Sequence, residues 1–187
     1  MNVTVIIPYT PNASRAEPYR RVREHLDGWT VMVAENDAPL YCRAKVLNTA
    51  IAAADTEIVV INDADSLVPH IQIREAVRLA AEQPGLVYAY TVYVRLDEHG
   101  RRGLVIHEAP SHGCVAIRRD CFLEVGYDEA YEGWGPEDQD FNRRAPWPVR
   151  RVPGELEHLW HGERRSDDSP LDTPAEAVSA NWQRHHG

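Results

Sequence analysis

The chain has 187 residues, a formal net charge of −9 at pH 7 and a hydrophobic fraction of 43%. This length suits one domain with its own core, and the hydrophobic content excludes wholesale disorder. No apolar run approaches the ~18 residues of a membrane span, and the N-terminus lacks the features of a secretory signal, so we expect a cytoplasmic protein. The acidic balance argues against nonspecific binding to duplex nucleic acid, which depends on lysine and arginine contacts with phosphates.

The first part of the chain alternates predicted strands with predicted helices. Apolar, β-branched runs predict strands at 3–7, 30–34 and 57–61. Helical spacing of apolar residues and strong helix formers predict helices over 17–26, 43–54 and 70–83. Strands that alternate with helices in this way are typical of βαβ units, in which neighbouring strands pair in parallel.

The pattern changes from residue 86 onward. We predict one long strand over 86–96, a hairpin turn at Glu98-His99-Gly100, a short strand over 113–117, and helices over 120–125 and 136–144. The capping box Thr173-Pro174-Ala175-Glu176 predicts a short C-terminal helix that covers the sheet edge. The prediction is therefore one α/β domain over 1–165, with a mixed, mainly parallel central sheet flanked by helices, and a C-terminal tail over 166–187.

Two carboxylates follow the third predicted strand, where Asp63 and Asp65 stand one residue apart on a turn. Ligands of open α/β sheets bind outside the carboxyl ends of the strands. Carboxylates in that position can hold a hard divalent cation, which is well suited to bridging a diphosphate. A solvated turn with an Asp cap on the next helix explains the same residues, so the pattern alone leaves both interpretations open.

His158 and His161 form a second candidate site. Their spacing places them on one side of a helical turn, but on opposite faces of a strand. Imidazole is a ligand for manganese and zinc alike, and a mixed set of Asp and His fits a first-row cation. The alternative is a pair of surface histidines with no ligand.

The third candidate is the segment Gly133-Trp134-Gly135, followed by Pro136, Glu137 and Asp138. Glycines on both sides of a tryptophan let the backbone bend tightly while the indole stays presented. Acidic residues in the first turn of a helix complement its dipole, which by itself accounts for Glu137 and Asp138. The functional interpretation is an aromatic platform beside a carboxylate that can act as a general base.

Lys45 is the only lysine among the 20 lysine and arginine residues. A general bias toward arginine explains this count. The alternative is that position 45 requires a buried, compact ammonium group, which a planar guanidinium cannot replace.

Taken in chain order, these segments resemble glycosyltransferases of the GT-A fold, and most closely the β-1,4-galactosyltransferase family, with a looser likeness to polypeptide GalNAc-transferases. The resemblance covers roughly residues 3–162. It is carried by the Pro8-Tyr9 strand end, "YCRAKVLNTAI" from Tyr41, "VVINDAD" ending at Asp65, "GCVAIRRDCFLEVGYDE" from Gly113, "GWGPEDQDF" from Gly133 and "HLWH" from His158.

The resemblance implies a UDP-sugar donor and a divalent cofactor, Mn2+ or another cation such as Mg2+. The implied metal ligands are Asp65 and His161, with His158 at a position where relatives carry either Met or His. The resemblance places the following residues around the nucleotide: Pro8, Tyr9, Thr10, Glu35, Tyr41, Arg43, Lys45, Asp63 and Asp65. Among these, Arg43 is expected on the diphosphate, and Asp63 near the ribose or the water shell of the metal.

The resemblance also implies that Asp138 deprotonates the acceptor hydroxyl in a direct displacement with inversion, while Glu137 positions the acceptor. The other implied sugar contacts are Trp134, Gly135, His112 and Gly113. His112 stands where the family has a glycine, and the upstream tyrosine that helps set donor choice in relatives is not evident, since Pro110 lies about there. The galactose specificity of the family is therefore not carried over. The acceptor is unknown: a glycan, a small molecule or, against the acidic charge, modified DNA. A retaining enzyme and an inactive nucleotide-sugar-binding or carbohydrate-binding module remain alternatives.

Overall fold

The computed structural model describes residues 2–11, 13–35, 41–107, 111–133, 135–162 and 175–186. Within these residues the chain forms two β-sheets and six helices. No helix in this described part combines the length and the apolar character that crossing a membrane requires.

The central sheet has six strands in the order β2-β1-β3-β8-β5-β9. Their bounds are β1 Val3–Pro8, β2 Thr30–Ala34, β3 Ile58–Asn62, β5 Leu86–Tyr88, β8 Cys114–Arg118 and β9 Val149–Arg151. Strand β1 pairs in parallel with β2 and β3, and β5 pairs in parallel with β9. Strand β8 runs antiparallel to β3 and β5. The predicted α/β class with a mixed, mainly parallel sheet is therefore confirmed.

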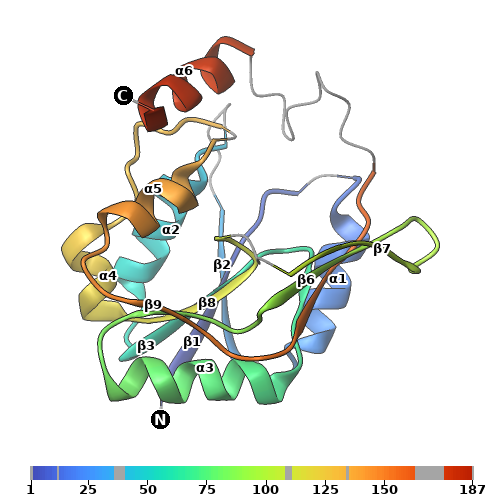
Figure 1. The fold of residues 1–187 in the computed structure, drawn as a ribbon, viewed down its shortest axis with the longest axis horizontal. Coiled ribbons are helices and arrows are strands. Elements are labelled where there is room, and N and C mark those ends of the chain that lie inside the picture. Colours follow the sequence, from blue (N-terminus) through green and yellow to red (C-terminus); the bar gives the residue numbers. More distant parts are fainter. Residues whose placement is uncertain are drawn as a thin grey trace.

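Helices cover both faces of this sheet (Figure 1). The helices are α1 Ala16–His25, α2 Arg43–Ala53, α3 His70–Glu82, α4 Arg119–Val125, α5 Glu137–Arg144 and α6 Ala175–His186. Figure 1 shows α2, α4 and α5 together on one side of the sheet, and α1 and α3 on the other. This arrangement explains why β1 and β3 read as continuous apolar runs, because a strand covered on both faces has no solvent side.

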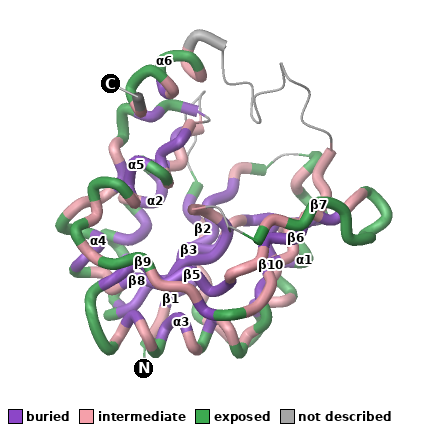
Figure 2. Tube along the Cα trace, viewed as in Figure 1, coloured by how far each residue is buried: buried purple, intermediate pink, exposed green. Residues whose placement is uncertain are grey.

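The core lies where β1 and β3 run side by side between the helices (Figure 2). Ile6 and Ile7 of β1, and Val59 and Val60 of β3, are completely buried. Each such side chain contributes roughly 1.5–3 kcal/mol relative to an exposed one. The carboxyl ends of both strands belong to this tightly packed core. The residues that directly follow them are therefore held in defined positions.

The second, smaller sheet was not predicted. It has the order β4-β10-β6-β7, with β4 Ser66–Leu67, β6 Val92–Leu96, β7 Arg102–Ile106 and β10 Glu155–His158. The single strand predicted over 86–96 is therefore wrong, since it divides into β5 and β6 in different sheets. The physical reason lies in the partner strands. The amide of Ala89 donates to Cys114 O on β8, whereas the amides of Thr91 and Val92 donate to Gly154 O, ahead of β10.

Helix α6 lies beyond the end of the central sheet, next to α5 (Figure 1), and not over a sheet edge as predicted. Asn181 of α6 donates a hydrogen bond from Nδ2 to the carbonyl oxygen of Glu132, at 2.8 Å. A Cβ atom added to Gly135 would lie 2.9 Å from Cβ of Asn181, so the glycine permits this close approach. The predicted capping residues Thr173 and Pro174 lie outside the described residues.

Candidate functional site

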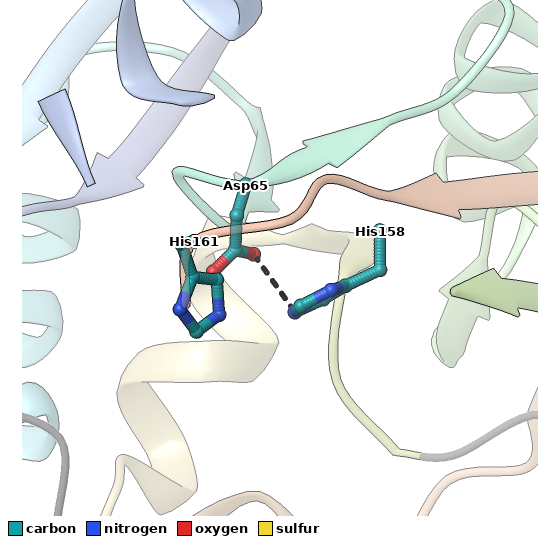
Figure 3. Close-up of side chains that lie close together, drawn as sticks. All are labelled: Asp65, His158 and His161. Atoms are coloured by element: carbon teal, nitrogen blue, oxygen red, sulfur yellow. Dashed lines mark ion pairs between the residues drawn. The ribbon is translucent and has the colours of Figure 1, made fainter. Parts of the chain in front are cut away.

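The first group of candidate residues is Asp65, His158 and His161, which could hold a metal ion and which we call the metal triad (Figure 3). One ligand atom from each lies within 4.8 Å of the others. Nε2 of His158 is 3.7 Å from Oδ1 of Asp65, and Nε2 of His161 is 3.5 Å from Oδ2. Both imidazoles thus face the same carboxylate, which belongs to a residue only 5% exposed.

Long-range pairing builds this triad. Strand β10 runs antiparallel to β4, which sets His158 opposite Ser66, next to Asp65. The amide of Leu159 then donates to the carbonyl oxygen of Asp65 at 2.7 Å. The turn between β3 and β4 is held by Asn62, whose Nδ2 donates to the carbonyl oxygens of Asp63 and Ser66. The histidine spacing alone could not reveal this arrangement, because His158 ends a strand and His161 follows in a loop.

Burial fits these imidazoles for metal binding. It lowers the pKa of His161 to about 4, although the nearby Asp65 carboxylate acts in the opposite direction. Burial lowers the pKa of His158 as well. Both rings are therefore neutral at pH 7, which is the form that coordinates a cation. Two neutral imidazoles and one carboxylate are a donor set that fits a first-row divalent cation.

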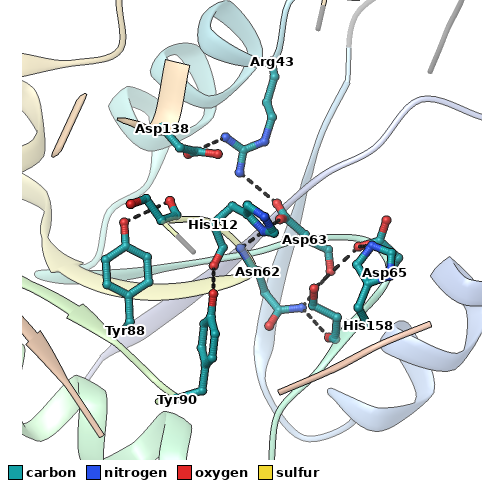
Figure 4. Close-up of polar contacts among 12 residues, drawn as sticks. Arg43, Asn62, Asp63, Asp65, Tyr88, Tyr90, His112, Asp138 and His158 are labelled. Atoms are coloured by element: carbon teal, nitrogen blue, oxygen red, sulfur yellow. Dashed lines mark hydrogen bonds and ion pairs between the residues drawn. The ribbon is translucent and has the colours of Figure 1, made fainter. Parts of the chain in front are cut away.

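The second group is a carboxylate cluster in which Asp63, Glu137 and Asp138 surround the guanidinium of Arg43. Figure 4 shows two of these carboxylates, Asp63 and Asp138, beside Arg43. Nη1 of Arg43 lies 2.7 Å from Oδ1 of Asp138 and 3.4 Å from Oε1 of Glu137, and Nη2 lies 2.8 Å from Oδ1 of Asp63. Arg43 opens α2 and Glu137 opens α5, so the cluster joins two helix starts to the end of β3.

Asp63 belongs to this cluster, while Asp65 belongs to the metal triad. Oδ2 of Asp63 accepts a hydrogen bond from the amide of Gly113 at 2.9 Å, and Nδ1 of His112 lies 3.8 Å from the same oxygen. Gly113 has a φ of +95° and its Cβ would lie 2.6 Å from Leu156 Cδ1, so the backbone conformation and the close packing both favour glycine. The two aspartates of one turn therefore serve two adjacent groups.

Asp138 has one engaged oxygen and one open oxygen. Oδ1 accepts hydrogen bonds from Arg43 and, at 2.8 Å, from the hydroxyl of Tyr127. Oδ2 accepts none from the part of the chain that the structure describes. Tyr127 lies within the segment from Gly113 that carries the family resemblance, but no role was assigned to it from the sequence, because a tyrosine after a short helix is ordinarily a core residue.

Glu137 is the most enclosed member of the carboxylate cluster, with 6% of the residue exposed. Its Oε2 atom is buried and has no hydrogen-bond partner among the described residues. Burial, reinforced by the neighbouring Asp138, raises the pKa of Glu137 to about 8, while Arg43 opposes this shift. The carboxyl group is therefore largely protonated at neutral pH.

The predicted nucleotide residues near β1 lie at the carboxyl end of the sheet. Pro8 ends β1, and the ring of Tyr9 stacks on Tyr19 with a centroid distance of 3.9 Å. The hydroxyls of Thr10 and Tyr41 are buried, and neither has a hydrogen-bond partner within the described ranges. Buried hydroxyls without a partner, at the carboxyl end of the sheet, are positions where a ligand or a water molecule completes the hydrogen bonding.

Other predicted residues lie apart from both groups or outside the description. Lys45 is exposed on α2, so the predicted burial of its ammonium group is wrong, because its position in the third residue of the helix faces solvent. Glu35 is exposed after β2. Trp134 falls outside the described residues, while Gly135 adjoins Asn181 as described above.

Arg15 is a residue of the site that sequence reasoning missed. It precedes α1, and its Nη1 atom lies 3.7 Å from Oδ2 of Asp65. Its side chain is mostly buried, with 22% exposed, and it lies next to the metal triad. No motif surrounds it, and only the fold reveals its proximity to a carboxylate fifty residues later in the chain.

No known protein-family profile matches this sequence, and no curated protein matches it. Solved structures do match. The structure of GalNAc-T7 with UDP, GalNAc and Mn2+ aligns with 99% of this chain at a TM-score of 0.59 and 14% identity; the alignment spans 50% of GalNAc-T7. Glucosyl-3-phosphoglycerate synthase from Mycobacterium tuberculosis, in complex with Mn2+, UDP and phosphoglyceric acid, aligns with 89% of this chain at a TM-score of 0.52 and 17% identity, over 72% of its own length.

A third solved structure has a different activity. The 2-C-methyl-D-erythritol 4-phosphate cytidylyltransferase from Thermus thermophilus aligns with 99% of this chain and 100% of its own, at a TM-score of 0.53 and 14% identity. At such identities a similarity establishes the fold alone. The fold is that of GT-A glycosyltransferases, and this cytidylyltransferase shares it.

Proposed function

We propose that this chain is a metal-dependent glycosyltransferase, similar to the β-1,4-galactosyltransferases, that transfers a sugar from a UDP-sugar to an acceptor hydroxyl with inversion. The observation that carries the proposal is the position of the metal triad beside the carboxylate cluster. One turn supplies both groups, with Asp65 in the triad and Asp63 in the cluster. Fold neighbours in complex with UDP and Mn2+ support it.

The metal triad would hold Mn2+ or a similar cation, which neutralises charge on the departing diphosphate when bound. The chain's own residues supply the rest. Thr10 and Tyr41 offer their buried hydroxyls to the nucleotide. Arg15, beside Asp65, and Arg43, in the carboxylate cluster, would offer their guanidinium groups to a diphosphate at this edge of the sheet.

Asp138 is the general base of the proposed transfer. The acceptor oxygen forms a bond to the anomeric carbon as the bond from that carbon to the diphosphate oxygen breaks. The acceptor proton passes to Oδ2 of Asp138, the oxygen that accepts no hydrogen bond from described residues. One displacement of this kind inverts the anomeric configuration. Glu137, with its orphan Oε2, lies next to this path and would orient the acceptor.

Release of UDP tests the proposal. The protein is incubated with Mn2+ and, separately, with UDP-glucose, UDP-galactose, UDP-GlcNAc and UDP-GalNAc, and UDP from slow donor hydrolysis is measured. We expect UDP release from at least one donor. The Asp65→Asn variant should lose this release. The control Asp55→Asn, which changes an exposed aspartate away from the site, should keep it. Binding of UDP without any release would instead indicate a binding module. Once an acceptor is found, the anomeric configuration of the product separates inversion from retention.

A nucleotidyltransferase is the second candidate, because the cytidylyltransferase aligns over its entire length. Such an enzyme would join a nucleoside triphosphate to a sugar phosphate and release pyrophosphate. Incubation with CTP or UTP and a panel of sugar phosphates distinguishes the two functions. Pyrophosphate release without any UDP release from UDP-sugars would favour this candidate over the glycosyltransferase.

A further inference from the structure

Tyr127 is held in place by contacts with three helices, α2, α4 and α5. Its ring packs against Phe122 of α4 and Phe141 of α5, with centroid distances of 5.5 and 4.8 Å. Its backbone is held by Asn48 of α2, which accepts from the Tyr127 amide at 2.9 Å and donates to its carbonyl oxygen at 3.0 Å. Three helices therefore determine where the phenol hydroxyl lies.

That hydroxyl is directed at Asp138. It donates to Oδ1 at 2.8 Å, and Asp138 is its one hydrogen-bond partner within the described part of the chain. Burial, reinforced by Asp138, holds the pKa of Tyr127 well above its ordinary value, so the phenol remains a proton donor. A phenylalanine would satisfy the aromatic packing equally well, whereas a buried hydroxyl is costly unless it is bonded. The hydroxyl therefore has a task that the ring does not explain.

We infer that Tyr127 is the positioning residue of the proposed base: it fixes Oδ1 of Asp138 and thereby presents Oδ2 to the acceptor hydroxyl. The inference rests on the proposed function. A carboxylate oxygen has two lone pairs, and Arg43 and Tyr127 together occupy both on Oδ1. The incoming proton is consequently directed to Oδ2.

Arg43 by itself would not hold the base reliably through a reaction. Its guanidinium is shared among Asp63, Glu137 and Asp138, and an entering diphosphate would add a further anionic partner. Tyr127 donates to Asp138 without these competitors. A diphosphate that drew Arg43 away from Asp138 would leave the bond from the phenol to Oδ1 intact.

The test compares two variants that each delete one buried phenol hydroxyl. Tyr127→Phe removes the bond to Asp138, while the control Tyr88→Phe removes bonds to Asn142 and to the Ser111 carbonyl. With the UDP-sugar that wild type hydrolyses, we expect kcat to fall about 10-fold in Tyr127→Phe, as for the loss of one hydrogen bond to a charged group. The KM for the donor and the affinity for Mn2+ should not change. In Tyr88→Phe, kcat should stay within about twofold of wild type at a comparable Tm.

A double-mutant cycle separates positioning from a structural role. Because Tyr127 acts through the base, Tyr127→Phe should cost nothing further in an Asp138→Asn background. Incorporating 4-aminophenylalanine at position 127, which keeps an N–H donor, should restore most of kcat. An equal loss of kcat in both backgrounds, with wild type active, overturns this inference alone. A wild type that hydrolyses no donor overturns the proposed function, and this inference with it.

Discussion

Arg43 and Asp138 are joined by a 2.7 Å hydrogen bond although they stand 95 residues apart in the sequence. The bond connects the first residue of α2 to the first turn of α5, and Arg43 also reaches Asp63 at the end of β3. The proposed base is therefore anchored to the same guanidinium as the turn that carries Asp65, a proposed metal ligand. A substitution in the turn after β3 should therefore affect the position of Asp138, and a substitution at Asp138 should affect the turn.

Asp138→Asn tests the proposed base. The amide keeps the shape of the side chain but cannot take up the acceptor proton, so transfer should fall by roughly 10²–10⁴-fold. Affinity for UDP and Mn2+, measured by calorimetry, should stay close to that of wild type. The control is Asp55→Asn, which changes an exposed aspartate in the same way. Transfer at the wild-type rate in Asp138→Asn would mean that the base lies elsewhere.

His158→Ala and His161→Ala test the metal triad. Each removes an imidazole whose Nε2 atom faces Asp65. Loss of a residue that supports a ligand costs ~10–100-fold in metal affinity, so loss of a direct ligand should cost no less. Titration with Mn2+ measures the effect, with the exposed His99→Ala as control. A dissociation constant that stays unchanged in both variants would remove these histidines from the site.

The sequence predicted the parts of the fold that local patterns determine. The runs at β1 and β3 are apolar because both faces of each strand are covered, and β-branched residues mark them plainly. The carboxyl ends of such strands meet at one edge of the sheet, which is why the sequence could name Asp63 and Asp65 as candidates for a site.

What the sequence could not predict depends on partners distant along the chain. The division of 86–96 into β5 and β6 is determined by β8 and β10, and the convergence of His158 on Asp65 by the pairing of β10 with β4. Arg15 lies in no motif, and Tyr127 lies in a segment of the family resemblance that assigned it no role; only packing brings both residues to carboxylates. For Lys45 the sequence suggested too much. As the only lysine it was considered as a buried ammonium group, whereas the side chain is exposed on α2.

Arg15→Ala should change metal and nucleotide binding in opposite directions. The guanidinium lies 3.7 Å from Asp65, where its positive charge disfavours a cation at the same carboxylate. Without nucleotide, Mn2+ should therefore bind a few-fold more tightly to the variant. With Mn2+ saturating, UDP should bind more weakly, because a cation near the diphosphate is lost. Arg23→Ala, an exposed position on α1, is the control. Parallel changes in both affinities would contradict this role.

The last prediction concerns the pH dependence of stability that Glu137 imposes. Its pKa in the folded protein is raised to about 8, first by burial and then by Asp138, with Arg43 in opposition and Asp63 adding to the shift. An unfolded glutamate has a pKa of ~4.3, so between these values the folded protein retains a proton that the unfolded chain releases. The resulting stability is fully present below a pH of ~4.3 and is lost as the pH rises through about 8.

Glu137→Gln separates this effect from every other titration, because the amide keeps the shape of a protonated carboxyl and has no proton to lose. We expect the Tm of wild type to fall relative to that of Glu137→Gln as the pH is raised from about 6 to about 9. Glu155→Gln is the control, since the pKa of this exposed carboxyl is lowered by Arg102 and lies outside the window. Infrared spectra should also contain a protonated-carboxyl band at neutral pH that Glu137→Gln lacks. If the Tm difference is constant across the window and the band is absent, Glu137 is ionised, and it would meet the acceptor as a carboxylate that only accepts hydrogen bonds.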